Sequence, residues 1–342
     1  MSDAHAQLWL LLRDTSRSFY LTLRLLPGRV RPQIGLAYLL ARTTDTVADT
    51  DLVSVERRLE ALALLRERVL GRSSSPLDFR LFLVGDDGEP NQGPDVAERR
   101  LLLRCEDAIA ALRAFSKEDQ RQIETVIDVI TSGQELDLRR FGDATPGTIH
   151  SLQTAEELDD YTYRVAGCVG TFWTQMCEAH LFGASGWNAQ AQRRDGLRFG
   201  KGLQLVNILR DLPRDLRQGR CYLPAKSLLL ASLTPEALLD PSRMADLRPV
   251  YDTFLALADS HLQAGWQYTM RIPRRALRLR MACALPILLG VRTLERLRTG
   301  NPLDPEVRIK VSRVEVRRAI GRALAAAFGL QSWDAVKRWA SR

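Results

Sequence analysis

Apolar residues recur at helical spacing along most of this chain. Leu36, Leu39 and Leu40 follow this spacing, which returns within residues 59–65 and 123–130. It lines one face of an α-helix with apolar side chains. The alternation of apolar and polar residues that is typical of strands is scarce. We therefore predict an all-α protein, a helical bundle built from amphipathic helices.

Three polar segments interrupt the predicted helices. Residues 84–96 (VGDDGEPNQGPDV) are rich in Gly, Asp and Pro and predict a surface loop. Further breaks are predicted at residues 141–147 and 232–249, where prolines and glycines gather. No repeat of fixed period is present, so residues 1–342 are predicted to form a single domain.

One predicted helix carries a polar stripe on a single face. Tyr38, Arg42, Asp45 and Asp49 stand at offsets of 0, 4, 7 and 11 residues. At about 100° per residue these offsets return to one narrow line along the helix. Asp45 and Asp49 then lie one turn apart, and like charges at this spacing need a compensating cation. Arg42 or a divalent metal ion would supply it.

A second predicted helix repeats the pattern. Gln204, Asn207, Asp211 and Asp215 stand at offsets of 0, 3, 7 and 11 residues, and the opposite side of the helix is apolar. Pro213 removes a backbone donor, so we expect the helix to bend or end there and Asp215 to leave the stripe.

The two stripes offer hard oxygen ligands without histidine or thiolate. Magnesium prefers one or two carboxylates together with water and substrate phosphate, so the stripes fit a magnesium site. Solvated helix faces explain the same residues equally simply, and this alternative stays open. Arginine side chains suited to clamping phosphate oxygens flank both stripes, namely Arg17, Arg42, Arg210, Arg217 and Arg220.

Composition narrows the classes of partner. The formal net charge is +8 with a pI of about 9.5, which suits an anionic ligand, and arginine far outnumbers lysine. The sequence lacks the interleaved basic and aromatic residues that would indicate nucleic-acid binding. The five cysteines are scattered and only four histidines are present, so neither a zinc site nor a disulfide framework is predicted. We expect a reduced, cytoplasmic protein.

Membrane contact is left open by the sequence. No stretch approaches the roughly 20 apolar residues of a membrane span. Residues 315–342 predict an amphipathic helix, with Ile320, Leu324 and Phe328 beside basic residues. Such a helix allows peripheral contact with a membrane, and packing on the bundle accounts for it equally well.

Several segments resemble one protein family, the squalene and phytoene synthases. In chain order they are SRSFYL at 16–21, Tyr38-x-x-x-Arg42-x-x-Asp45-x-x-x-Asp49, GQELDL at 133–138, YTYRVAGCVG at 161–170 and QLVNILRDLPRDLRQGRCYLP at 204–224. The resemblance implies a helical bundle of the isoprenoid synthase type with a central cavity. It also implies that two farnesyl diphosphates are joined head to head through presqualene diphosphate.

The C-terminal third resembles the squalene-forming members of this family. MACALPILLGVRTL at 281–294 and VRIKVSR at 307–313 carry this likeness, which implies a final reduction by NADPH to squalene. Members without the reduction would make presqualene diphosphate, hydroxysqualene, dehydrosqualene or phytoene. A non-catalytic binding or assembly protein on the same fold is the alternative of another class.

The resemblance also implies roles for individual residues. Magnesium would be held by Asp45, Asp49, Asp211 and Asp215, and catalysis would involve Asp45, Asp211 and Tyr161. Substrate would be bound by Ser18, Phe19, Tyr38, Arg42, Gln204, Asn207, Arg210 and Arg220. No G-x-G-x-x-G fingerprint follows a strand, so NADPH would lie on a surface near Lys310 and Arg313. The family's aspartate motifs commonly read D-x-x-E-D, whereas Ala48 and Arg214 stand at the glutamate positions.

The segment that begins at Tyr161 holds a further stripe. Read as a regular helix, it aligns Tyr161, Val165, Cys168 and Phe172 on one face. Gly167 and Gly170 are predicted to permit the close approach of another helix.

Overall fold

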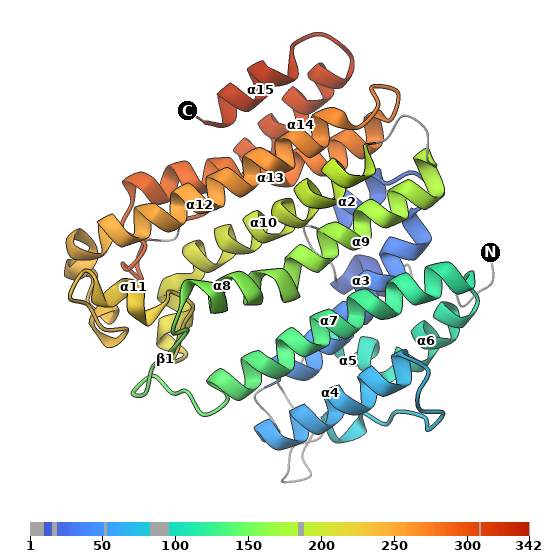
Figure 1. The fold of residues 1–342 in the computed structure, drawn as a ribbon, viewed down its shortest axis with the longest axis horizontal. Coiled ribbons are helices and arrows are strands. Elements are labelled where there is room, and N and C mark those ends of the chain that lie inside the picture. The colour runs from blue at the N-terminus through green and yellow to red at the C-terminus, as the bar shows by residue number, and fades with distance from the viewer. Residues whose placement is uncertain are drawn as a thin grey trace. The chain divides into compact units, whose positions relative to one another are not determined.

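The computed structural model describes residues 10–15, 19–50, 53–82, 96–183, 188–307 and 309–341. The described residues are overwhelmingly helical and include two strands of two residues each, which confirms the predicted all-α class (Figure 1). Apart from Val96, the predicted loop 84–96 lies outside the described residues. The chain divides into two compact units, residues 1–142 with 175–183 and residues 143–174 with 184–342. The single domain stays a prediction.

The first unit is helical throughout its described elements. These are α2 (Phe19–Leu25), α3 (Arg31–Asp49), α4 (Val55–Val69), η1 (Arg80–Phe82), α5 (Val96–Leu103), α6 (Cys105–Arg113), α7 (Lys117–Phe141) and the π-helical turn η3 (Glu178–Phe182). Serines begin two of the helices, because Ser54 accepts from the Arg57 backbone N–H and Ser116 from that of Asp119. The apolar faces predicted at Leu36, Leu39 and Leu40 and within residues 59–65 and 123–130 are largely buried.

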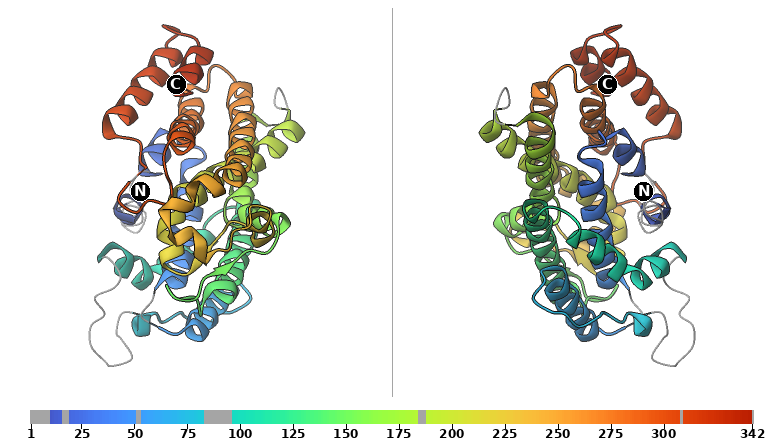
Figure 2. Two further views of the ribbon diagram at one scale, coloured as in Figure 1. Left: turned by 90° about the vertical axis from the view of Figure 1, so that its left-hand side faces the viewer. Right: turned by 90° about the vertical axis from the view of Figure 1, so that its right-hand side faces the viewer.

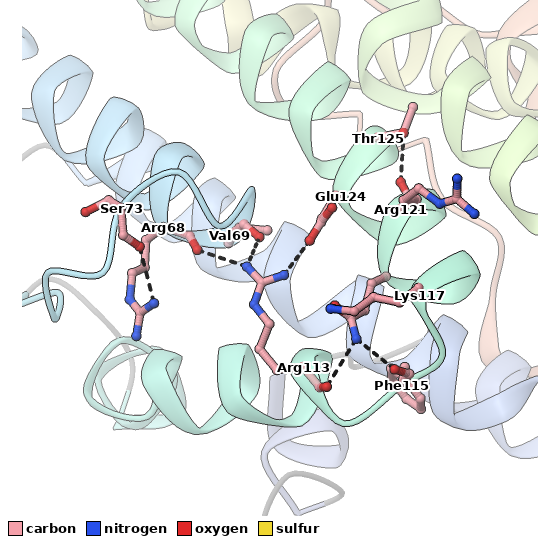
Figure 3. Close-up of polar contacts among 10 residues, drawn as sticks. Arg68, Val69, Ser73, Arg113, Phe115, Lys117, Arg121, Glu124 and Thr125 are labelled. Carbon is pink, nitrogen blue, oxygen red and sulfur yellow. Dashed lines mark hydrogen bonds and ion pairs between the residues drawn. The ribbon is translucent and has the colours of Figure 1, made fainter.

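Arg113 joins three helices of this unit. Its guanidinium donates to the carbonyl oxygen of Val69 at 2.6 Å and to that of Arg68 at 3.3 Å, at the C-terminal end of α4. The same side chain pairs with Glu124 on α7 (Figure 3). A cation near the last carbonyl groups of a helix satisfies acceptors that have no partner within that helix. The Arg113–Glu124 pair is therefore a structural contact.

The second unit contains the longest helix and both strands. Its elements are β1 (His150–Ser151), α8 (Ala155–Thr162), η2 (Tyr163–Gly167, a π-helical turn), α9 (Cys168–Cys177, whose last residues belong to the first unit), α10 (Ala189–Arg217), β2 (Arg220–Cys221), α11 (Ala225–Leu229), η4 (Glu236–Leu239), η5 (Pro241–Arg243), α12 (Met244–Arg271), α13 (Leu277–Thr299), α14 (Arg313–Ala327) and α15 (Trp333–Ala340). The strands pair in parallel, with His150 opposite Arg220. Helices α10, α12 and α13 run side by side (Figures 1 and 2).

Glycines let the neighbouring helices approach α10 closely. A Cβ atom on Gly170 would lie 1.9 Å from the carbonyl oxygen of Gly196, and one on Gly167 would lie 3.2 Å from Cγ of Lys201. A Cβ on Gly200 would lie 2.1 Å from the carbonyl oxygen of Ala166. Side chains at these positions would push α10 away, so the predicted role of Gly167 and Gly170 in close helix approach is confirmed.

Two prolines lie inside helices where breaks were predicted. Helix α10 continues past Pro213 to Arg217, and α12 begins at Met244 and contains Pro249. A proline at 213 leaves the carbonyl of Leu209 without its usual backbone donor. The hydroxyl of Tyr251 on α12 donates to that carbonyl at 2.8 Å, within the core. Of the two outcomes predicted at Pro213, a bend or an end of the helix, the end does not occur, because tertiary packing supplies the missing donor.

The C-terminal segment forms two helices rather than one. Helix α14 ends before Gly329, whose φ of 75° no ordinary residue adopts readily, and Ser332 caps the start of α15. Both helices pack on α13. Glu315 fastens this arrangement, because its carboxylate accepts from Arg292 at 2.7 Å and from Arg296 at 2.6 Å. Packing on the bundle, one of the two predicted explanations of residues 315–342, is thus observed.

Candidate functional site

The stripe on α3 is the accessible side of an otherwise buried helix. Between residues 33 and 50 the accessible positions are Tyr38, Ala41, Arg42, Asp45 and Asp49. The helical spacing therefore predicted correctly which side chains share the open face. The row is therefore the part of this stretch of α3 that remains accessible to solvent.

Arg42 joins the α3 stripe to a carboxylate on another helix. One of its terminal nitrogens donates to Asp45 and the other donates to Glu98, which lies in the first turn of α5. Desolvation raises the pKa of Asp45, Arg42 opposes that rise, and the negative charge of Glu98 adds to it. Because the Asp45 side chain is 42% exposed, solvent limits the size of this rise in pKa. Sequence reasoning missed Glu98, because no spacing relates it to the stripe.

The stripe on α10 is also accessible. Gln204, Asn207, Asp211 and Asp215 all retain contact with solvent, whereas Leu205, Val206 and neighbouring leucines are buried. The helix remains continuous past Pro213, so Asp215 stays on the same helix as the other three residues. The helix end that was one of the two predicted reasons for Asp215 to leave the stripe is therefore absent between the described residues 189 and 217.

Arg210 grips the first aspartate of this stripe with both ends of its fork. Its Nε donates to one carboxylate oxygen of Asp211 at 2.8 Å and its Nη2 donates to the other at 2.6 Å. The hydrogen bonds to Asp211 hold the pKa of Arg210 above its ordinary value. Both stripes thus carry an aspartate that is paired with an arginine of the same helix.

The two positions that depart from the family's motif differ in exposure. Ala48 is buried, with 7% of its surface accessible, and its carbonyl accepts from Arg58 at 3.2 Å. Arg214 is exposed. A glutamate at position 48 would bring an acidic group into the interior of the first unit, which is costly without a partner.

Tyr161 is buried and stacks on Tyr222, with ring centroids 4.8 Å apart. The π-helical turn η2 begins two residues later and adds a residue to the helical repeat. The single stripe predicted for Tyr161, Val165, Cys168 and Phe172 assumed a regular helix, so that assumption was wrong. Tyr161, Cys168 and Phe172 are nonetheless buried, whereas Val165 is only half-buried.

A buried lysine, which sequence reasoning also missed, fastens α8 to α10. Lys201 is 7% exposed, and its ammonium group donates to Asp159 at 2.6 Å. Asp159 stands two residues before Tyr161, so this ion pair helps fix the helix that carries Tyr161. The charge of Lys201 also acts on His261 of α12. Burial, together with the charges of Arg198 and Lys201, lowers the pKa of His261 to about 4.

The remaining predicted residues are more dispersed. Arg220 lies on β2, and Lys310 and Arg313 are exposed around the start of α14. Ser18 and the side chain of Phe19 lie outside the described residues. No helix among the described residues has the length and apolarity that crossing a membrane requires.

The donors present fit magnesium bound to a diphosphate. Across the described residues, no three His, Cys, Asp or Glu side chains are grouped to hold a metal ion by themselves. Magnesium commonly takes one or two carboxylates and completes its shell with water and substrate phosphate. Accessible aspartates one turn apart, with arginines beside them, match that requirement.

Comparisons with known proteins bear on the whole chain. A model of the protein family described as squalene/phytoene synthase matches residues 12–315. The chain is 25% identical over 299 residues to the squalene synthase of Saccharomyces cerevisiae, which covers 83% of this chain and 59% of that protein. It is 28% identical over 243 residues to the 15-cis-phytoene synthase of Synechocystis, which covers 66% of this chain and 57% of that protein.

A third relative is much longer than this chain. It is a bifunctional lycopene cyclase/phytoene synthase of Blakeslea trispora, 29% identical over 228 residues, with 64% of this chain and 32% of that protein covered. The chain therefore spans 32% to 59% of the length of these three relatives.

Solved structures share the fold. A ligand complex of TcSQS superposes with a TM-score of 0.77 at 20% identity, covering 99% of this chain and 90% of that one. A squalene synthase of Alicyclobacillus acidocaldarius gives 0.59 at 20% identity, covering 86% and 93%. These likenesses confirm the predicted isoprenoid synthase type of helical fold.

Proposed function

Because the chain belongs to the squalene/phytoene synthase family, we propose that it joins two farnesyl diphosphates head to head and reduces the product to squalene. The observation that supports this most is the pair of accessible stripes, each with an arginine-paired aspartate, in a chain that matches the family over residues 12–315. Because the named relatives are longer than this chain, its substrate and its product are both part of the proposal.

In this proposal the aspartates Asp45, Asp49, Asp211 and Asp215 hold magnesium on the diphosphates of the substrates. Magnesium, when bound, neutralises the charge that develops on a departing diphosphate. Arg42 exchanges Asp45, and Arg210 exchanges Asp211, for diphosphate oxygens, since a guanidinium fork suits either anion. Gln204, Asn207 and Tyr38 present further polar groups on the same accessible faces.

The protein must also protect the allylic cation that forms when a diphosphate leaves. The second substrate's double bond attacks this cation and a proton is lost, which gives presqualene diphosphate. Water must be excluded from the reacting carbons, and aromatic faces stabilise positive charge. Tyr161, held against Tyr222 and away from solvent, is our candidate for this role and for handling the proton.

Reduction to squalene needs a hydride, which NADPH would supply. Lys310 and Arg313 are exposed cations around the start of α14, and such cations suit the phosphates of that cofactor. A non-reducing synthase is the second candidate, because two of the relatives named above are phytoene synthases. Their names favour a product formed without hydride.

Product analysis distinguishes the candidates. Purified protein is incubated with farnesyl diphosphate and magnesium, with and without NADPH, and the extracted products are separated. We expect squalene only when NADPH is present. A hydrocarbon product that NADPH does not change would exclude the reductive step and favour the second candidate. Absence of any product, in the presence of folded protein, would count against the enzymatic proposal itself.

We also propose peripheral contact with anionic membranes, where a hydrocarbon product would accumulate. Phe328 is 73% and Leu330 is 81% exposed beside the turn after α14, and Arg317 and Arg318 are exposed on the same helix. Sedimentation with phosphatidylglycerol vesicles should be lost in the Phe328→Ser/Leu330→Ser variant. The control is Leu229→Ser/Leu230→Ser, which removes a similarly exposed apolar pair at the C-terminal end of α11. Equal binding by all three proteins would refute this site.

A further inference from the structure

The guanidinium of Arg42 is shared between two carboxylates of unequal exposure. Asp45 belongs to the stripe and its side chain is 42% exposed, whereas that of Glu98 is 23% exposed. Glu98 comes from α5, so its position is set by a different helix from the one that carries Arg42. The pair with Glu98 is the more enclosed of the two, and enclosed pairs are screened less by solvent and salt.

Binding of a metal ion at Asp45 would change the balance of these contacts. A divalent cation and a guanidinium compete for the same carboxylate, and their like charges repel each other. Arg42 would then lose Asp45 as a partner. Its Nη1 would then be free to donate to a diphosphate oxygen, while its Nη2 still donates to Glu98.

We propose that Glu98 is a positioning residue, which keeps Arg42 at the site while Arg42 exchanges Asp45 for a diphosphate oxygen. The inference rests on the proposed function of the α3 stripe. An arginine side chain has many rotamers, and holding one end of the fork reduces the entropy lost when the other end binds. Glu98 also supplies a negative charge that acts on Asp45, in a motif whose customary glutamate is replaced by Ala48.

An exclusively structural role for Glu98 makes different predictions. The pair would then only fasten α5 to α3, as the Arg113–Glu124 pair fastens α6 to α7 (Figure 3). Glu124 is a suitable control, because its side chain is 20% exposed against 23% for Glu98 and it also pairs with an arginine of the first unit. If both pairs are only structural, loss of either carboxylate lowers Tm and leaves diphosphate binding unchanged. If Glu98 positions Arg42, loss of Glu98 also weakens diphosphate binding.

The test compares binding of inorganic pyrophosphate at saturating Mn²⁺, by titration calorimetry, with Tm on the same full-length proteins. We expect Glu98→Gln to weaken pyrophosphate binding about tenfold, which corresponds to about 1.4 kcal/mol. It should raise the KM for farnesyl diphosphate similarly and change kcat less than threefold. Glu124→Gln should leave pyrophosphate affinity unchanged. Glu98→Asp, which keeps the charge, should recover part of the loss.

A double-mutant cycle checks that the effect passes through Arg42. In an Arg42→Gln background, Glu98→Gln should have no further effect on pyrophosphate affinity, because the group that it positions is gone. Undiminished effects in that background would overturn the inference. So would wild-type pyrophosphate affinity in Glu98→Gln, provided that Asp45→Asn weakens binding. If Asp45→Asn binds like the wild type, the proposed function of the stripe fails first, and the inference fails with it.

Discussion

The stripes on α3 and α10 present similar donors, but each depends on a neighbouring helix in a different way. On α3 the neighbour contributes charge, because Glu98 of α5 shares Arg42 with Asp45. On α10 the neighbour contributes a hydrogen-bond donor to the backbone, because the hydroxyl of Tyr251 on α12 donates to the carbonyl of Leu209.

The arginines of the two stripes are held differently as well. Arg42 divides its fork between two carboxylates on different helices, whereas Arg210 directs two nitrogens to the one carboxylate of Asp211. Metal binding at Asp211 would therefore release Arg210 from that carboxylate, whereas Arg42 would keep Glu98. The comparison teaches that a recurring pattern of aspartates does not fix how firmly its arginine stays in place.

The largest expected effect tests what the two stripes have in common. Asp45→Asn and Asp211→Asn should each lower turnover of farnesyl diphosphate on the order of 1,000-fold, about 4 kcal/mol, because each removes a charged group that we propose as a metal ligand. Far-UV circular dichroism should remain unchanged. Asp128→Asn is the control, since Asp128 pairs with Arg66 at 2.6 Å outside both stripes. Normal turnover in either stripe variant would show that the two stripes are not equivalent.

A smaller effect tests the support specific to α10. Tyr251→Phe removes the donor to the carbonyl of Leu209 and should destabilise the protein by about 1–3 kcal/mol in urea unfolding. The burial of Tyr251 raises the pKa of its hydroxyl, so the group stays a donor at all ordinary pH values. In a Pro213→Ala background the backbone N–H of residue 213 can bond to Leu209, so the cost of Tyr251→Phe should fall by half or more. An equal cost in both backgrounds would contradict this account of Pro213.

The smallest effect tests the charge specific to α3. Because the pKa of Asp45 is raised, its ionised form is disfavoured in the folded protein and reduces stability above the pKa of the unfolded chain. This penalty is complete above the raised pKa, shrinks as the pH falls below it and is gone below the pKa of the unfolded chain. Asp45→Asn should therefore raise Tm at pH 7 by about 1–2 °C and by less at pH 4.

Glu98→Gln provides the matched comparison for this pH effect. Removing the negative charge of Glu98 should lower the pKa of Asp45 and shrink the gain from Asp45→Asn at pH 7. Thermal unfolding of the wild type, Asp45→Asn, Glu98→Gln and the double variant at pH 4 and pH 7 measures this difference in Tm. An increase in Tm from Asp45→Asn that is larger at pH 4 than at pH 7 would contradict the upward shift assigned to the pKa of Asp45.

Local sequence was sufficient for the helical class and for the composition of each stripe. The spacing of Asp45 and Asp49, or of Asp211 and Asp215, fixes their common face wherever the helix is regular. It failed where regularity failed: the π-helical turn η2 disturbs the stripe predicted from Tyr161, and Gly329 divides the predicted C-terminal helix.

The partners of these residues were decided by tertiary structure. Glu98, Tyr251 and Lys201 act on groups 56, 42 and 42 residues away, and no local pattern relates them. The sequence alone determined which donors each helix offers, because side-chain direction repeats every few residues. Only the packing of distant helices decided which counterion neutralises Arg42 and which hydroxyl replaces the donor lost at Pro213, because these contacts depend on which surfaces come together when the chain folds.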